Sequence, residues 1–118
     1  MCGIAGIYSK NKSLNTLNNI ARNMANAIFH RGPDDSGLWQ NECIALSHRR
    51  LSIIDLSKAG HQPMISNCGR YVIVFNGEIY NHKSIRKELT NFNKHIKWYG
   101  MSDTEVLLTA IVCWGIEK

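Results

Sequence analysis

Residues 1–8 read MCGIAGIY, and they give the first strong expectation about the fold. Apolar side chains and two glycines over 3–8 predict a short buried strand that begins almost at the first residue. Cys2 directly precedes that strand. We therefore expect the start of the chain to be held inside the fold, with a thiol at the head of its first strand.

The rest of the sequence alternates short strands with helices. Apolar residues that recur every three or four positions after Ser13 predict a first helix, and Ser102 or Asp103 can cap a last one. The dipeptide Asn76-Gly77 is typical of a tight hairpin turn with positive φ that leads into a return strand. The expected helices cover 14–29, 82–92 and the residues after 102 or 103, and the expected strands cover 3–8, 38–40, 43–48, 71–75 and 78–80.

Composition restricts the class of protein. With 118 residues, 44% of them hydrophobic, the chain fits one small domain. It has no apolar run of 18 residues and no secretory signal, so we expect a cytoplasmic protein without a membrane partner. The formal charge is +5, but the basic residues are scattered, and nucleic acid is not expected as a partner. Four cysteines without a C-x-x-C pair predict neither a metal site nor a disulfide framework.

Cys2 is the sharpest candidate for chemistry. A small second residue allows the initiator methionine to be removed, which leaves a cysteine at the amino terminus. A thiol has a reference pKa of about 8.5 and an α-amine one of about 7.7 to 8.0, so the amine can take the thiol proton at neutral pH. Nucleophile and base then belong to one residue. Position alone is weak evidence, because a free cysteine is more often structural.

Other residues could bind and activate an amide substrate. Asn76 and Gly77 offer a side-chain amide and a backbone N–H to a developing oxyanion, although an ordinary hairpin turn explains the same pair. Arg50 has the planar fork that pairs with a carboxylate, and surface charge is its alternative role. Glu78 or Asp103 can accept from an ammonium group, and Asp103 could instead cap the last helix.

Five ordered segments, MCGIAGIY, HRGPDDSG, HRRLSIIDLSKAGHQPM, VFNGEIYNH and MSDTEV, closely resemble the glutaminase domain of asparagine synthetases, which are class II glutamine amidotransferases. The resemblance runs from residue 1 to about residue 115. It implies an α+β fold of the amino-terminal nucleophile (Ntn) hydrolase type, a four-layer αββα sandwich of antiparallel sheets. That sandwich would be incomplete here, so residues 2–118 are expected to form a glutaminase domain truncated at its C-terminal side.

The resemblance also implies roles for individual residues. Cys2 matches the nucleophile that attacks the side-chain amide of glutamine, and Asn76 and Gly77 match the oxyanion hole. Arg50 matches the residue that binds the substrate carboxylate, while Glu78 and Asp103 match those that hold its α-amino group. Arg31 matches a supporting loop residue next to the site. The full substrate-binding set is Arg50, Leu51, Ser52, Ile53, Ile54, Asn76, Gly77, Glu78 and Asp103.

In the resembled family the ammonia passes to a synthetase domain, where ATP and magnesium activate aspartate. That domain is not in this sequence, so no cofactor is expected in this chain. The expected partners are glutamine as substrate, a synthetase domain or subunit, and a second copy in a homodimer.

Three alternatives stay open. The glutaminase domain could serve an amidotransferase with another ammonia acceptor. A catalytically silent fragment could act as a binding module, in which case its charge of +5 predicts strongly salt-dependent binding to a polyanion. A papain-like thiol enzyme would instead pair Cys2 with a histidine.

Overall fold

The computed structural model describes residues 1–52 and 57–117. The chain divides into two compact units. The first, here called the sheet unit, comprises Met1–Ser52, His61–Pro63 and Val74–Gly77. The second, here called the helical unit, takes the remaining segments, of which the largest is Glu78–Lys118.

The sheet unit is built on three antiparallel strands in the order β1-β3-β2. Its elements are β1 (Gly3–Tyr8), α1 (Leu14–Ala27), the 3-10 turn η1 (Phe29–Arg31), β2 (Asp35–Gln40) and β3 (Ile44–Arg50). Strand β3 pairs with β1 from Gly3↔Arg49 to Tyr8↔Ile44 and with β2 along its other side. The central strand of this sheet therefore ends at Arg50.

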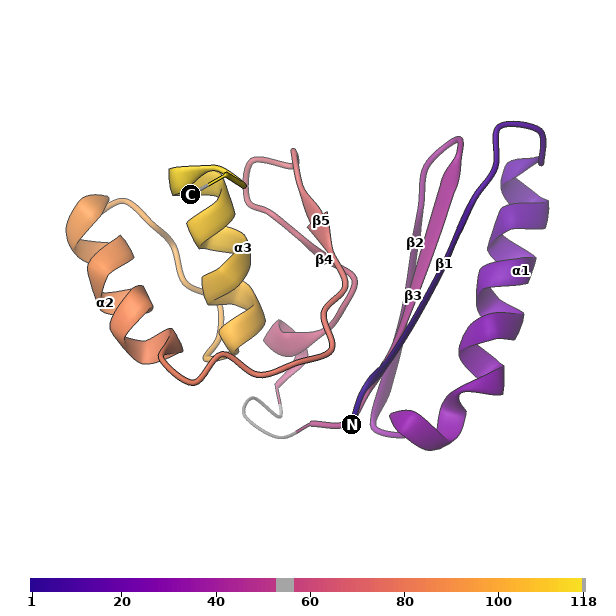
Figure 1. The fold of residues 1–118 in the computed structure, drawn as a ribbon, viewed down its shortest axis with the longest axis horizontal. Helices are drawn as coiled ribbons and strands as arrows, with labels where there is room; N and C mark the ends of the chain where they lie inside the picture. The colour runs from indigo at the N-terminus through magenta and orange to yellow at the C-terminus, as the bar shows by residue number, and fades with distance from the viewer. Residues whose placement is uncertain (53–56, 118) are drawn as a thin grey trace. The chain divides into compact units, whose positions relative to one another are not determined.

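Helix α1 covers one face of this sheet (Figure 1). Its first turn is capped by Ser13, whose Oγ accepts from the backbone N–H of Thr16 at 3.2 Å. Leu17 and Ala21 of the helix form a fully buried cluster with Ala45 of β3. Because strand side chains alternate between faces, His48 and Arg50 lie on the face of the sheet opposite α1.

The helical unit contains a hairpin and two packed helices. Its elements are η2 (Lys58–Gly60), β4 (Met64–Ile65), β5 (Val72–Ile73), α2 (His82–Phe92) and α3 (Asp103–Trp114). Strands β4 and β5 pair antiparallel, and Ser66 N–H donates to the carbonyl of Tyr71 at 2.9 Å to close the turn. Gly69 has φ 72°, a conformation that glycine adopts without steric cost.

Helices α2 and α3 pack on each other through the fully buried Leu89 and Val106. The connection between them is held by side chains from both helices. Arg86 of α2 donates to the carbonyl of Gly100 at 2.7 Å, and the Glu105 carboxylate of α3 accepts from the backbone N–H of Tyr99 and Gly100 at 3.0 and 3.1 Å. The described helices include none long and apolar enough to cross a membrane.

Most of the predicted elements are confirmed. The mixed α+β class, the antiparallel pairing, the first strand and all three helices are observed within a few residues of the expected bounds. The stacking of two sheets in a four-layer sandwich stays a prediction.

The predicted hairpin at Asn76-Gly77 is wrong. No strand follows over 78–80, and Gly77 is not among the positive-φ glycines. The strand expected over 71–75 is shorter, because only Val72 and Ile73 pair with β4. The reason is that side chains distant in the sequence bind the backbone groups of Phe75 that a hairpin would need.

Candidate active site

Cys2 lies at the head of β1, beside the end of β3. The backbone N–H of Leu51 donates to the Cys2 Sγ at 3.3 Å, and the thiol faces the carbonyl oxygen of the same residue at 3.5 Å. Met1 in front of it is 72% exposed. Among the described residues, the hydrogen bonds of the Cys2 sulfur go to Leu51 and none goes to a histidine.

Arg50 ends β3 next to this thiol and is 8% exposed. Its carbonyl accepts from the backbone N–H of Asp34 at 3.0 Å. The Asp34 carboxylate in turn accepts from the backbone N–H of Ser52 at 2.9 Å. These bonds tie the loop of the RGPDD segment to the end of β3, and they fix the direction in which the chain leaves Arg50.

Arg31, in the same loop region, lies beside the start of β1. A Cβ built on Gly3 would come within 3.1 Å of the Arg31 Cβ and 2.8 Å of the Ile28 Cδ1. Glycine at position 3 therefore allows close packing against the end of the α1 region. This packing explains Gly3 without any contact to a substrate.

Asn76 and Gly77 are exposed and directly follow Phe75, whose backbone is held on both sides. The Phe75 N–H donates to the Gln62 Oε1 at 2.6 Å. The Phe75 carbonyl lies 3.3 Å from the His48 Nε2. Because both backbone groups of Phe75 bond to side chains, they are not available for the ladder of a hairpin.

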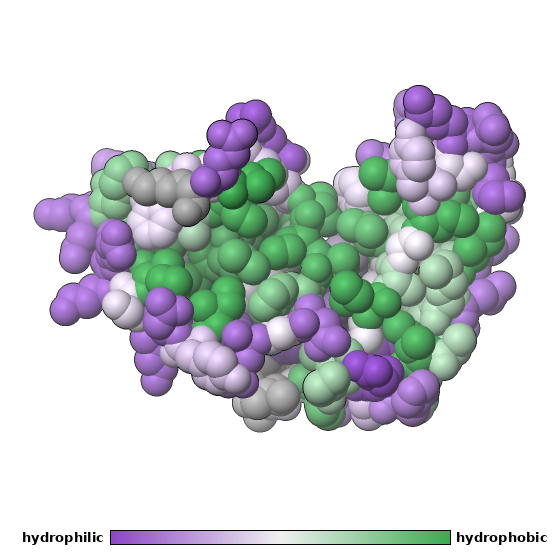
Figure 2. All heavy atoms as spheres, viewed as in Figure 1, coloured by the Kyte–Doolittle hydropathy of each residue, from purple (hydrophilic) through white to green (hydrophobic). Residues whose placement is uncertain are grey.

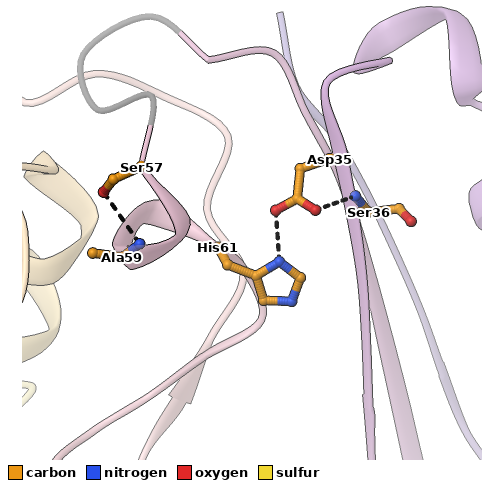
Figure 3. Close-up of polar contacts among 5 residues, drawn as sticks. All are labelled: Asp35, Ser36, Ser57, Ala59 and His61. Carbon is orange, nitrogen blue, oxygen red and sulfur yellow. Dashed lines mark hydrogen bonds and ion pairs between the residues drawn. The ribbon is translucent and has the colours of Figure 1, made fainter.

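The segment that carries Gln62 is anchored on β2. His61 Nδ1 contacts the Asp35 carboxylate at 2.6 Å, and the other oxygen of that carboxylate accepts from the backbone N–H of Ser36 at 2.9 Å (Figure 3). A Cβ built on Gly37 would lie 1.9 Å from the carbonyl oxygen of Gln62. Only glycine allows the 61–63 segment to approach β2 this closely.

His48 is a buried titratable group within this arrangement, with 1% of its surface exposed. Burial lowers the pKa of its imidazole, since desolvation disfavours the charged form. The nearby Arg50 guanidinium and His61 imidazole act in the same direction, whereas the bond to Phe75 and the charge of Asp35 oppose it. His48 is therefore neutral at physiological pH.

Glu78 and Asp103 lie in the helical unit. The Asp103 carboxylate is 6% exposed and accepts from the backbone N–H of Ile79 at 2.9 Å, directly beside Glu78. Ser102, not Asp103, caps α3, because its Oγ accepts from the backbone N–H of Glu105 at 3.2 Å. The Asp103 carboxylate is thus directed to the segment that follows Gly77.

The predicted site residues divide between the two units. The sheet unit holds six of them, and the helical unit holds Glu78 and Asp103. Ile53 and Ile54 lie outside the described residues. The six residues in the sheet unit are Cys2, Arg50, Leu51, Ser52, Asn76 and Gly77.

Sequence reasoning missed His48 and Gln62. A signal for His48 was present, because a polar residue stands two positions before Arg50 in a strand with alternating side chains. Gln62 lies in a polar connection that carries no periodic pattern, so only the structure assigns it a partner.

The helical unit also contains a cavity of about 850 Å³. Figure 2 shows apolar side chains gathered on the face of this unit where α3 and β4 lie. None of the predicted site residues that the structure describes lines the cavity. The described residues contain no group of three or more histidine, cysteine or carboxylate side chains that could hold a metal ion.

Comparison with known proteins first identifies the family of this chain. The family model of the glutamine amidotransferase domain matches residues 1–118. The chain therefore belongs to the glutamine amidotransferase domain family.

The chain is also similar to several individual proteins. The chain is 41% identical over 110 residues to asparagine synthetase [glutamine-hydrolyzing] 1 of Bacillus subtilis, with 92% of this chain and 17% of the relative covered. It is 36% identical over 108 residues to asparagine synthetase B of Escherichia coli, with 92% and 19% covered. It is 35% identical over 117 residues to asparagine synthetase 1 of Arabidopsis thaliana, with 99% and 19% covered. The chain spans less than a quarter of the length of these relatives.

Proposed function

We propose that this chain is the glutaminase half of an asparagine synthetase, in which Cys2 hydrolyses glutamine to glutamate and ammonia. The observation that carries the proposal is the family match over residues 1–118, which includes a cysteine at the head of the first strand. Removal of the exposed Met1 would leave the thiol and a free α-amine on one residue.

The chemistry proceeds in two steps. The α-amine takes the thiol proton, and the sulfur attacks the side-chain amide carbon of glutamine to form a tetrahedral intermediate. The amine then returns the proton to the departing nitrogen, which leaves as ammonia, and a γ-glutamyl thioester remains. Water attacks the thioester, the carbon–sulfur bond breaks, and glutamate leaves. This division replaces one difficult amide hydrolysis by two easier steps.

Asn76 and Gly77 are assigned to the oxyanion. Removing one preorganised oxyanion donor typically costs about 10² to 10³ in kcat, so the position of this pair strongly affects the rate. Both residues are exposed, as groups that meet a substrate must be, and the residue before them is held by two buried side chains.

Arg50 and the two acidic residues are assigned to the ends of the glutamine molecule. The guanidinium of Arg50 provides the planar, bidentate donor set that suits a carboxylate. Glu78 and Asp103 are assigned to the α-ammonium group, with Leu51, Ser52, Ile53 and Ile54 lining the pocket. The bond from Ile79 to Asp103 supports this assignment, because it brings the Asp103 carboxylate beside Glu78.

The acceptor of the ammonia is proposed from the relatives. Several of them are named as glutamine-hydrolysing asparagine synthetases, and amidation of aspartate requires ATP and magnesium in a synthetase domain. We propose that further chain or a partner subunit supplies that domain, together with the strands that would complete a four-layer sandwich in a cytoplasmic enzyme. Dimerisation is proposed on the resemblance alone.

Alkylation by a diazoketone analogue of glutamine tests the nucleophile. We expect intact-mass analysis to show loss of Met1, and peptide mapping to place the first label on Cys2 rather than on Cys43, Cys68 or Cys113. Iodoacetamide, which does not resemble glutamine, is the control reagent, and excess glutamine should protect only against the analogue.

A variant with one serine inserted between Met1 and Cys2 separates this mechanism from a papain-like one. The insertion keeps the thiol but removes its α-amine, so glutamine hydrolysis should be lost. Ammonia release at the normal rate from a chain that retains residues ahead of Cys2 would overturn the proposal.

A further inference from the structure

We propose that His48, acting with Gln62, is a positioning residue for the oxyanion-binding segment Asn76-Gly77. The inference rests on the proposed function for its catalytic consequence. Its structural part, that these two side chains fix the backbone that leads into Asn76, stands on contacts within the sheet unit alone.

The backbone of Phe75 is held by side chains and not by a strand ladder. Residues 74–77 form no strand, so their backbone groups have no ladder partners to fix them. Instead, Gln62 accepts from the Phe75 N–H at 2.6 Å, and the His48 Nε2 lies 3.3 Å from the Phe75 carbonyl. The carbonyl held by His48 belongs to the same peptide plane as the Asn76 N–H, so its position sets the orientation of Asn76.

Both supporting side chains are themselves fixed. His48 belongs to the central strand β3, which is paired on both sides, and it is 1% exposed. Gln62 is 6% exposed, and the segment that carries it is anchored by the contact between His61 and Asp35 and by its close approach to Gly37. Rigid support of this kind is what a precisely placed oxyanion donor requires.

The hydrogen bond to Phe75 determines the protonation of His48. A carbonyl oxygen can only accept, so the Nε2 must carry the proton. The Nδ1 is buried and has no hydrogen-bond partner in the described part of the chain. Protonating the Nδ1 would place an unpaired N–H in a buried site, which is unfavourable. The neutral Nε2–H tautomer is therefore the form that holds Phe75.

This assignment gives His48 a role other than general base. Its single proton is committed to the Phe75 carbonyl, and the Cys2 sulfur forms its hydrogen bonds with Leu51. A residue that acts only through Phe75 should affect the rate of the chemical step and leave glutamine affinity largely unchanged. A displacement of about 1 Å at a reacting group can cost about 10² in rate.

Two substitutions at position 48 test the proposal. His48→Gln keeps an N–H donor at about the distance of the Nε2, whereas His48→Leu keeps the bulk and removes the donor. We expect His48→Leu to lower kcat for glutamine hydrolysis at least tenfold, with KM changed less than twofold, and His48→Gln to recover most of that loss. Equal kcat values in the wild type and His48→Leu, or equal losses in both variants, would overturn the proposal.

Two substitutions of Gln62 form a matched pair that tests the hydrogen bond from the Phe75 N–H. Gln62→Glu keeps an acceptor for the Phe75 N–H, whereas Gln62→Met removes it at similar volume. Amide hydrogen exchange of Phe75 and Asn76, followed by NMR in the full chain, should accelerate at least tenfold in Gln62→Met and His48→Leu, but less in Gln62→Glu and His48→Gln.

The exchange measurement separates the two proposals. If the wild type releases no ammonia from glutamine, the proposed function fails, but exchange at Phe75 and Asn76 still tests the positioning. If the variants do not fold, the nitrogen chemical shifts of His48 in the wild type still test the inference, because they report which ring nitrogen carries the proton. An Nδ1–H tautomer, or an imidazolium at neutral pH, would overturn the inference.

Discussion

The carboxylate of Asp103 accepts a hydrogen bond from the backbone N–H of Ile79, with 2.9 Å between the two atoms. This contact joins the first residue of α3 to the residue after Glu78, across 24 positions of sequence. Ser102 satisfies the N-terminus of α3, so the Asp103 carboxylate is free of a capping role. Two residues assigned to the α-ammonium group of glutamine are thereby brought together.

Two variants of Asp103 should separate its charge from its hydrogen bond. Asp103→Asn keeps an oxygen acceptor for Ile79 and removes the negative charge, so KM for glutamine should rise while stability changes little. Asp103→Ala also leaves the Ile79 N–H without its partner, which should lower the free energy of unfolding by about 1 to 3 kcal/mol. Steady-state kinetics and urea unfolding measure the two effects. An unchanged KM in Asp103→Asn would contradict the assignment to the ammonium group.

Asn76→Ala should lower kcat for glutamine hydrolysis by about 10² to 10³, because it removes one donor from the oxyanion. Asn81→Ala is the matched control, since Asn81 is also exposed and its side chain makes no capping bond at the start of α2. Its kcat should equal that of the wild type. A comparable loss in both variants would show that the effect does not come from the oxyanion.

Arg50→Lys should raise KM for glutamine more than it lowers kcat, because the positive charge stays but the bidentate fork is lost. Lysine also avoids the large cavity that alanine would leave at a position only 8% exposed. Kinetics with glutamine at several concentrations distinguish the two parameters. A fall in kcat with constant KM would mean that Arg50 acts on the reacting amide instead of the carboxylate.

Acid should destabilise the protein through His48. The folded pKa of His48 lies below the ordinary value of 6.5, so below pH 6.5 the unfolded chain binds a proton more readily than the folded one. Stability from this residue is therefore complete above pH 6.5 and is lost as the pH falls toward the folded pKa. Urea unfolding at pH values from about 7.5 to about 5 should show this loss of stability, because that range spans the reference histidine pKa of about 6.5.

His48→Gln is the control for that titration, because glutamine does not ionise in this range. The difference between the two unfolding curves isolates the contribution of His48 from that of the neighbouring groups, Asp35 and His61 among them, which both proteins contain. Parallel curves would contradict a lowered pKa at position 48.

Gly37→Ala should disturb the segment that carries Gln62. Its Cβ would lie 1.9 Å from a backbone oxygen, so the segment must move, at a cost of about 1 to 3 kcal/mol in the free energy of unfolding. Gly6→Ala is the control on the same sheet, since its Cβ would meet the end of the Leu46 side chain at 3.0 Å, which can adjust. Thermal unfolding compares the two. Equal stability of both variants would show that the 61–63 segment is not closely docked on β2.

Local signals were sufficient to predict elements whose partners are close in sequence. Ser13 and Ser102 cap the helices that the apolar periodicity predicts, and the strand after Cys2 is observed from Gly3 to Tyr8. The turn at Asn76-Gly77 was misjudged because its backbone is controlled from 13 and 27 residues away, by Gln62 and His48. A dipeptide preference is weaker than several hydrogen bonds to buried side chains.

The candidate site likewise combines residues that the sequence predicts with long-range contacts that it does not predict. Residue type, order and resemblance predict Cys2, Arg50 and Asn76 as site residues, but they do not predict the contacts that support them. The pairing of β1 with β3 brings Cys2 beside Leu51, which is 49 positions away. Such long-range contacts depend on strand register, which the sequence pattern does not specify closely enough.

The shared dependence of Phe75 on His48 and Gln62 has a consequence for natural variation. A sequence that replaces His48 by a residue without a donor loses one of two restraints on the same peptide, so its tolerance for a change at Gln62 should shrink. Homologous chains should accordingly seldom lose the donor at position 48 and the acceptor at position 62 together, even though the two residues are 14 positions apart.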